Sequence, residues 1–512
     1  MGEAHDLSPV ALGTPTATRA RGTWAFSWPL VMAGVTYLYL LLHSRTLLRD
    51  GDTYWHVAAG RWILEHGTVP ARDPFSHSMP GAPWTAHEWL SEVVLATAHA
   101  VGGWTIVVAV TALAFALCIG LLTRALLRWL EPVYAVFFAA MALCMTAGHA
   151  LARPHMLAMP LMMMWMIGLV RASDERRAPS LWLLPVMLLW ANMHGGFTFG
   201  IAMTFAFAAE SLLAARKEGR LAPAMREWGI FIVLAMACAL ATPYGTGGIF
   251  FTWHLMVDSP YAMQRIEEWK SPNFHIFQPM LLWLLGGLAV MLHQGLRLPP
   301  VRLALMLGML YLALKHMRHI EILGLVGPLV LAAPLAAQWR ERKKAGAQLE
   351  HADRLFELLA RPAGRSALVG TLLVMLAIPA WLMRASPIAA HDALAPVRAL
   401  RAVQEAGIRG PVLNNFSLGG YLIYSGIPVF IDGRADMYGD RFLLEYTDAL
   451  GLRTKDSLPD LLSKYGITWT LLEREGPTVS MLDQMPGWRR VHTDEYTVVH
   501  ARIDALPATP HR

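Results

Sequence analysis

The residue types best suited to chemistry stand directly after the first apolar segment of the chain. Asp50 and Asp52 flank Gly51, and His56 follows Asp52 by four residues, which places these two side chains one helical turn apart on the same face. A carboxylate beside an imidazole can take a proton from a substrate or hold a divalent metal. The competing interpretation is structural, because aspartates also end apolar helices and cap the next one.

A second acidic group follows in the same segment, which runs from 46 to 103. His87, Glu88 and Glu92 stand together, and the two glutamates are again four residues apart. Connections of this length are usually functional, although the exposed face of a surface helix would also explain the glutamates. Two acidic groups in one segment favour a site.

Potential cations recur at the ends of later apolar segments. Ionisable groups in such positions cost energy unless they are paired or hydrated, and a single one is explained by a side chain that reaches the lipid headgroups. The group in LKHMRHIE is harder to explain in this way, and a bound anion would account for it. The residues are Arg153 and His155 in GHALARPH, His194 in WANMHGG, and Lys315, His316, Arg318 and His319 in LKHMRHIE.

Two other segments carry chemistry in their composition. In 244–275, the sequence RIEEWKSPNFH contains Glu267 and Glu268 and would form a lid over a site, or an amphipathic surface helix. Near the C-terminus, FIDGRADMYGDR offers Asp432, Arg434 and Asp436 to a polar ligand, although turns at strand ends explain its glycines equally well.

The elements that must position these residues are membrane helices. Of 512 residues, 55% are hydrophobic and 16% are charged, against about 25% charged in soluble domains. Apolar blocks alternate with short polar connections, as a bilayer requires. Eleven spans are predicted, and the short segments 180–194 and 302–315 would also fit a re-entrant pair. The segments are 27–45, 104–126, 132–149, 155–171, 180–194, 196–215, 228–243, 276–293, 302–315, 320–338 and 366–385.

The distribution of Lys and Arg predicts the orientation, because cytoplasmic connections carry the excess of both. With the N-terminus inside, the basic connections, of which 339–365 is the strongest, all fall on the cytoplasmic side. The acidic segment 46–103, the segment 244–275 and the C-terminus then lie outside. The net charge of +6 is scattered over short connections, which argues against nucleic acid as a partner.

Three regions follow from this pattern. We expect a cytoplasmic tail at 1–26, a transmembrane domain at 27–388 and a soluble extracytoplasmic α/β domain at 389–512. In the last region, PVLNN, PVFIDG, TWTLLE and TVVHAR are the expected strands. The three cysteines stand inside apolar runs without a metal-binding or paired spacing.

The acidic first outward segment, the cations at later outer helix ends and the C-terminal extracytoplasmic domain together resemble the GT-C class of membrane glycosyltransferases, with the motif Asp50, Gly51 and Asp52. The C-terminal segment GGYLIYSGIPVFIDGRADMYGD also resembles an uncharacterised group of bacterial multi-spanning membrane proteins. The resemblance implies an enzyme of the bacterial inner membrane that transfers a sugar from a polyprenyl-phosphate donor to a glycan, lipid or protein acceptor.

The resemblance also implies roles for single residues. Asp50 or Asp52 would act as base or would hold a divalent metal, Mg²⁺ or Mn²⁺, with His56 and Glu88 as catalytic neighbours. Cations near the membrane surface would hold the donor phosphate, and other polar residues would bind the acceptor. The phosphate group comprises Arg153, Lys315, Arg318 and His319, and the acceptor group comprises His87, Glu92, His194, Glu267, Asp432 and Arg434.

Two alternatives from other classes stay open. A transporter or flippase of a lipid-linked or anionic solute would place its site in broken helices near the bilayer midplane, and Asn192 and His194 before two glycines would suit such a helix. A sensor or assembly subunit would use the C-terminal domain to bind a partner. The glycosyltransferase hypothesis requires that the acidic residues face a cavity shared with Arg153 or Arg318.

Overall fold

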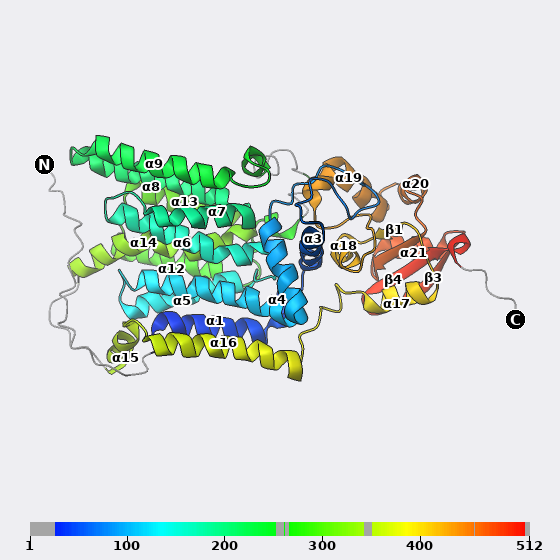
Figure 1. Ribbon diagram of the computed structural model, residues 1–512, viewed down its shortest axis with the longest axis horizontal. Coiled ribbons are helices and arrows are strands. Elements are labelled where there is room, and N and C mark those ends of the chain that lie inside the picture. Colours follow the sequence, from blue (N-terminus) through cyan, green and yellow to red (C-terminus); the bar gives the residue numbers. More distant parts are fainter. Residues whose placement is uncertain (1–25, 252–260, 262–265, 343–350, 455, 507–512) are drawn as a thin grey trace.

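The computed structural model describes residues 26–251, 261, 266–342, 351–454 and 456–506. The expected cytoplasmic tail lies outside these residues apart from Phe26, and so do parts of the expected lid and of the basic connection 339–365. Figure 1 shows two parts, a bundle of long helices and a smaller domain that contains the sheet, with the first outward segment between them.

Each of the eleven predicted apolar segments coincides with a helix of the bundle. Several of these helices begin at a proline, which is preformed for the first helical turn. The helices are α1 (Trp28–Leu42), α4 (Trp89–Leu126), α5 (Pro132–Ala147), α6 (Pro154–Asp174), η1 with α7 (Leu181–Leu183 and Leu184–Met193), α8 (Phe197–Lys217), α9 (Leu221–Leu240), α12 (Pro279–Gln294), α13 (Pro300–Lys315), α14 (Ile320–Arg342) and α16 (Arg365–Ala385).

The chain is a polytopic α-helical membrane protein. Within the described residues, six helices are long and apolar enough to cross a bilayer, and four shorter helices are also apolar. Large apolar side chains cover the outside of the bundle: Leu292 on α12 is 78% exposed, and Leu373 on α16 is 61% exposed. Such surfaces suit contact with lipid rather than water. The number of crossings stays a prediction.

The first outward segment is built from helices and one long coil. It contains α2 (Ser44–Leu47), α3 (Asp52–His66) and the first turns of α4. The α4 helix is interrupted at Gly102 and Gly103, and Gly103 has a φ of 60°, which favours glycine. Because of this break, the part of α4 that carries Glu92 takes its own direction above the membrane helix.

The C-terminal domain is a small α/β fold, as expected. Its sheet has the order β1-β2-β4-β3, in which β1 and β2 are parallel and the other pairs are antiparallel. The elements are α17 (Val397–Glu405), β1 (Val412–Asn414), α18 (Phe416–Tyr424), α19 (Ala435–Leu450), α20 (Ser457–Lys464), β2 (Trp469–Glu473), α21 (Pro477–Gln484), β3 (Trp488–Thr493) and β4 (Thr497–Arg502). Short helices η2 (Glu267–Trp269), η3 (Met317–His319), α15 (His351–Ala360) and η4 (Ile503–Ala505) complete the described elements.

One predicted strand is wrong. PVFIDG lies outside the sheet, and β3 at Trp488–Thr493 was not expected. The backbone of Val429 instead pairs with the first outward segment. Its N–H donates to the carbonyl of Phe75 at 3.1 Å, and its carbonyl accepts from the N–H of His77 at 2.9 Å. A partner more than 300 residues away in sequence thus takes the hydrogen bonds that a sheet would have used.

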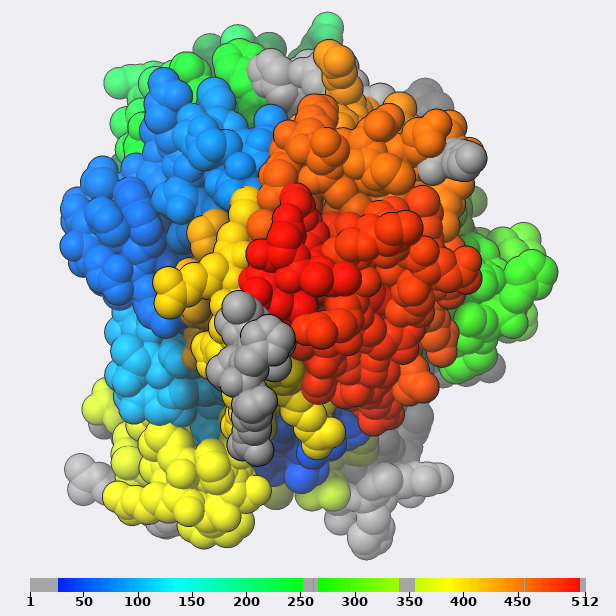
Figure 2. All heavy atoms as spheres, turned by 90° about the vertical axis from the view of Figure 1, so that its right-hand side faces the viewer, coloured from blue at the N-terminus to red at the C-terminus, as the bar shows by residue number. Residues whose placement is uncertain are grey.

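The C-terminal domain is docked on the first outward segment through glycines. A Cβ atom at Gly420 would come within 3.0 Å of the backbone carbonyl of Gly51, and one at Gly51 would come equally close to the carbonyl of Ser417. The helices α3 and α18 therefore lie backbone to backbone, as Figure 1 shows between the bundle and the sheet. In Figure 2 the domain, coloured yellow to red, covers this end of the molecule beside the blue first segment.

We expect Gly420→Ala to destabilise the docked domain by about 1–3 kcal/mol, because the added methyl group meets backbone that cannot move aside. Gly476→Ala is the matched control, since its Cβ would make only an ordinary contact with the carbonyl of Glu473 at 3.4 Å. Thermal unfolding in detergent, followed by protease release of the C-terminal domain, measures both. Equal behaviour of the two variants would contradict the docking geometry.

Candidate functional site

Three carboxylates meet at one guanidinium. Arg153 precedes Pro154, so its backbone is extended rather than helical, and its side chain projects from the start of α6. Its Nε lies 2.7 Å from Oδ2 of Asp50, its Nη2 donates to Asp50 and to Asp52, and its Nη1 donates to Oε1 of Glu268 at 3.3 Å. The expected acidic motif and the expected cation therefore form one ionic cluster.

Glu268 enters this cluster from the segment predicted as a lid. The short helices η2 and η3 lie against each other, because the N–H of Met317 donates to the carbonyl of Lys270 at 2.9 Å. Arg318 stacks over the ring of Trp269, 4.4 Å from its centroid, and its Nη1 is 3.9 Å from Oε1 of Glu268. Although burial opposes ionisation, the guanidiniums of Arg153 and Arg318 lower the pKa of Glu268 to about 2.

A second group of titratable side chains is centred on Glu88, the residue before α4. Its carboxylate oxygens lie 3.4 Å from Nε2 of His194, 3.7 Å from Nε2 of His56 and 3.8 Å from Nε2 of His87. The other nitrogen of the His56 ring, Nδ1, is 3.2 Å from Oε1 of the buried Glu92. The helices α3 and α4 and the junction between α7 and α8 each contribute to this histidine–glutamate group.

Burial dominates the charge state of this group. It raises the pKa of Glu88 to about 7, against the lowering effect of Arg153 and Arg318. It lowers the pKa of His56, His87 and His194. At neutral pH, neutral imidazoles thus surround a carboxyl group that is close to its own titration point, which is the condition a general acid or base requires.

Most of the predicted site residues face one cavity of about 300 Å³, which we call the loop-side cavity. The wall includes Asp52 and Glu88 together with Arg153 and Arg318, so the acidic residues and the cations share a cavity as the glycosyltransferase hypothesis requires. The predicted residues on this wall are Asp52, His56, His87, Glu88, Glu92, Arg153, His194, Arg318, His319 and Arg434.

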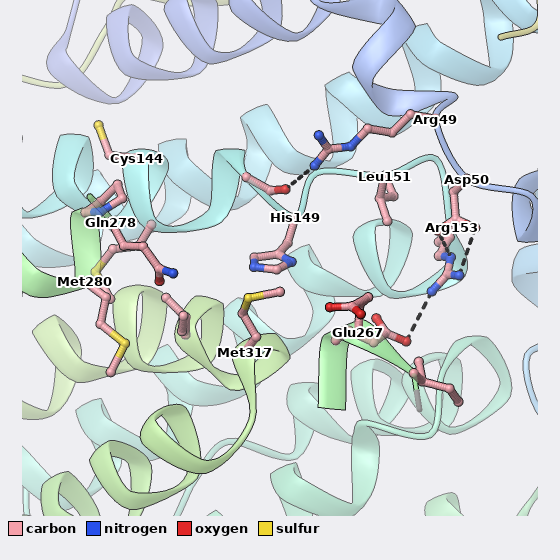
Figure 3. A pocket seen from close by; sticks show the side chains of 16 residues that line it. Arg49, Asp50, Cys144, His149, Leu151, Arg153, Glu267, Gln278, Met280 and Met317 are labelled. Carbon is pink, nitrogen blue, oxygen red and sulfur yellow. Dashed lines mark hydrogen bonds and ion pairs between the residues drawn. The ribbon is translucent and has the colours of Figure 1, made fainter. Parts of the chain in front are cut away.

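A second cavity of about 470 Å³ lies on the other side of Arg153, and we call it the bundle-side cavity. Figure 3 shows Arg49 and Asp50 at one end of it, His149 and Met317 in the middle, and Cys144 and Met280 at the other end. Arg153 and Glu268 line both cavities. The ionic cluster therefore forms a partition between the two cavities, whose lining residues differ.

Four predicted residues lie elsewhere. Asp50 lines the bundle-side cavity. The side chain of Glu267 is 80% exposed and is paired with Lys270, while its neighbour Glu268 points inward to Arg153. Lys315 is exposed and lines neither cavity. Glu267 also lines the bundle-side cavity, and the roles expected for Glu267 and Lys315 stay predictions.

Asp432 is fully buried in the fold and lines neither cavity, so its role in binding an acceptor stays a prediction. Arg434 donates from Nε and Nη2 to the two oxygens of Asp432 at 2.8 and 2.7 Å, and from Nη1 to Asp73 at 2.6 Å. Its guanidinium also lies over the ring of Trp84, 4.8 Å from the centroid. Arg434 lines the loop-side cavity, but its guanidinium is ion-paired with Asp432 and Asp73 and so links the C-terminal domain to the first outward segment.

Some site residues were not among the predicted ones. His149 and Glu321 line the loop-side cavity, and Arg49 lines the bundle-side cavity. Asp73, the partner of Arg434, had no signal in the sequence beyond its place in a long acidic segment. Asp436 was noted with its neighbours, and it lines the loop-side cavity, where burial raises its pKa and His87 opposes that effect.

The divalent metal that the resemblance implies would need free carboxylate ligands in this cluster. Carboxylate oxygens are suitable ligands for Mg²⁺ or Mn²⁺, but those of Asp50, Asp52 and Glu268 all point at Arg153, which occupies the position between them. In the described part of the chain, no set of three or more His, Cys, Asp or Glu side chains has the geometry to hold a metal ion. The residues therefore do not fit this cofactor in the present arrangement.

We expect Arg434→Ala to lower the free energy of unfolding of the C-terminal domain by about 3–5 kcal/mol, because it leaves the carboxylates of Asp432 and Asp73 buried without their partner. Arg453→Ala removes an exposed ion pair with Asp448 in the same domain and should cost about 0–1 kcal/mol. Differential scanning calorimetry in detergent compares the two. Similar small losses for both variants would show that the ion pairs of Arg434 do not stabilise the domain.

No protein-family model matches the chain, and no curated protein matches its sequence. Among solved structures, the oligosaccharyltransferase AglB from Archaeoglobus fulgidus, in complex with an inhibitory peptide and a dolichol-phosphate, matches with a TM-score of 0.52 and 12% identity over 87% of this chain and 69% of that chain.

Two further structures were found. The apo form of the Archaeoglobus fulgidus oligosaccharyltransferase gives a TM-score of 0.53 with 11% identity over 87% of this chain and 69% of that one. ArnT from Cupriavidus metallidurans bound to undecaprenyl phosphate gives 0.48 with 15% identity over 94% and 99% of the two chains. At 11–12% identity, the two oligosaccharyltransferase matches show the fold alone. The chain shares its fold with this oligosaccharyltransferase.

Proposed function

We propose that this protein transfers a sugar from a polyprenyl-phosphate donor to an acceptor on the extracytoplasmic side of a bacterial inner membrane. One observation carries the proposal. Two cavities, one bordered by apolar bundle helices and one closed by the C-terminal domain, meet at a partition of three carboxylates and Arg153. An enzyme that joins a lipid-linked donor to a polar acceptor needs two such spaces on either side of its reacting groups.

The bundle-side cavity has the chemistry of a site for the lipid-linked donor. Met145, Met280 and Ile320 line it, and flexible methionines adapt well to an apolar prenyl chain. Arg49 and Arg153 stand at its polar end, where a phosphate needs charged hydrogen-bond donors. Arg49 was absent from the predicted phosphate group, and its position makes it a better candidate than Lys315.

The partition has the chemistry to assist the transfer step. An acceptor hydroxyl that attacks the anomeric carbon must lose a proton, and a carboxylate within reach contributes typically 10²–10⁴-fold to such a step. The departing phosphate carries a developing negative charge, and a fixed guanidinium stabilises it without reorganisation. Arg153 is fixed by three carboxylates, which is the preorganisation that this kind of stabilisation needs.

The first test is turnover with a panel of radiolabelled polyprenyl-phosphate sugars, using purified protein in lipid nanodiscs. We expect the wild type to release or transfer the sugar of at least one donor. Asp52→Asn should lower the rate at least about 10²-fold, because it weakens the ionic cluster beside the reacting groups. Asp504→Asn, at an exposed pair with Arg502 in the C-terminal domain, should keep the wild-type rate.

A different result would select the transporter hypothesis. If the wild type turned over none of the donors and instead moved a polyprenyl-phosphate lipid between leaflets, the glycosyltransferase proposal would be rejected. Folding of each variant is checked by its elution in size-exclusion chromatography and by its unfolding temperature, so that a loss of turnover is not a loss of structure.

A further inference from the structure

The carboxylates of the acidic motif are already engaged. Both oxygens of Asp50 lie within hydrogen-bond distance of Arg153, and Asp50 faces the bundle-side cavity. Oδ2 of Asp52 is bonded to Arg153, and Oδ1 packs against the backbone of Gly433, where a Cβ atom would come within 3.0 Å of the carboxylate. Asp52 also lines the loop-side cavity and its side chain is 20% exposed, but its carboxylate, like that of Asp50, is ion-paired with the guanidinium of Arg153.

Glu88 differs from the aspartates in its partners, because in the described part of the chain its carboxylate is near histidines and makes no ion pair with Lys or Arg. It lines the loop-side cavity, and its side chain is 14% exposed there. Among the described residues, its nearest polar neighbours are the three histidine Nε2 atoms at 3.4, 3.7 and 3.8 Å, distances longer than those of good hydrogen bonds. Glu88 is thus a carboxylate in a cavity wall with unused capacity to accept a hydrogen bond.

The hydrogen bonds of two of these histidines fix which ring nitrogen carries the proton. Nδ1 of His194 accepts from the N–H of Gly196 at 3.0 Å, so the proton of the neutral ring is on Nε2, which faces Glu88. Nδ1 of His87 is 3.2 Å from the carbonyl oxygen of Thr85, which can only accept, so in this ring the proton is on Nδ1. Nε2 of His87 therefore faces Glu88 with a lone pair.

When Glu88 is ionised, two hydrogen-bond acceptors therefore face each other across 3.8 Å, Oε1 of Glu88 and Nε2 of His87. A proton donor placed beside both atoms would satisfy them, and a hydroxyl group of a ligand is such a donor. The surroundings suit a sugar-like ligand, because Trp55, Trp84 and Phe251 line the same cavity and Asp436 adds a polar contact. Flat aromatic faces and carboxylates are the groups that can contact the C–H and O–H faces of a sugar ring.

We propose that Glu88 and His87 form the subsite for the acceptor hydroxyl and that Glu88, rather than Asp50 or Asp52, is the general base of the transfer. This inference rests on the proposed function. The acceptor O–H bond breaks and its proton goes to Glu88, while the oxygen forms a bond to the anomeric carbon of the donor sugar. The bond between that carbon and the phosphate oxygen breaks with its electron pair on the phosphate, so polyprenyl phosphate leaves.

The aspartates have a different part in this scheme. Asp50, Asp52 and Glu268 orient Arg153, whose guanidinium lies beside the departing phosphate, so their loss would impair the leaving-group side of the reaction. Glu88 acts on the nucleophile side. Variants that lack Glu88 and variants that lack an aspartate should therefore respond differently to a nucleophile that carries no proton.

Azide is such a nucleophile, because it attacks the anomeric carbon without deprotonation. We would measure sugar release from the radiolabelled donor by wild type, Glu88→Ala and Asp52→Asn in nanodiscs, with water alone and with sodium azide. Glu88→Ala should release sugar to water at least about 10²-fold more slowly than wild type. Azide should restore most of that loss and yield the glycosyl azide, whereas Asp52→Asn should not recover.

Two controls separate the base role from folding. Glu88→Gln keeps the size of the side chain but cannot accept a proton, so it should lose the same activity as Glu88→Ala. Glu65→Ala, which changes an exposed glutamate on α3, should keep the wild-type rate. Binding of a fluorescent polyprenyl phosphate to Glu88→Ala should equal that of wild type, because the donor occupies the other cavity.

The remaining outcomes overturn the inference. A wild-type rate of water-dependent release in Glu88→Ala would exclude this residue as the base, and so would a failure of azide to rescue a variant that still binds the donor lipid. Rescue of Asp52→Asn instead would assign the base to Asp52. An absence of turnover by the wild type with every donor would reject the proposed function and this inference together.

Discussion

The shared ion pair of Arg153 is the interaction on which the rest of the site depends. Three carboxylates from two segments, Asp50 and Asp52 from one and Glu268 from the other, would repel one another in a partly buried wall. Removing the partner of a buried charge costs several kcal/mol, so the guanidinium is what allows the first outward segment, the start of α6 and η2 to meet. Where they meet, they divide the interior into two cavities with different linings.

The C-terminal domain is part of this construction rather than an appendage to it. Gly51 and Gly420 allow α3 and α18 to lie in backbone contact, and Gly433 packs on the carboxylate of Asp52. Arg434 then holds Asp73 from the first outward segment. The domain thus closes one cavity and at the same time limits the rotamers of the acidic motif. A shift of the domain would therefore change the positions of the reacting groups.

Much of the fold could be predicted because the bilayer acts on local sequence. Length and hydropathy suffice to locate a membrane helix, and every predicted apolar segment coincides with a helix. PVFIDG was misassigned for the opposite reason. Its short apolar run is typical of a strand, but the backbone partners of Val429 lie at Phe75 and His77, and no local pattern encodes such a distant pairing.

The sequence by itself determined the class of protein, the residue types of the site and the segments that carry them, because composition, helical spacing and charge bias are local properties. Only the tertiary structure decided which side chain of each pair does the work. Glu268 rather than Glu267 points to Arg153, and Asp436 rather than Asp432 reaches the cavity. Neighbouring residues of the same type differ only in direction, and direction is set by packing between segments that are far apart in the chain.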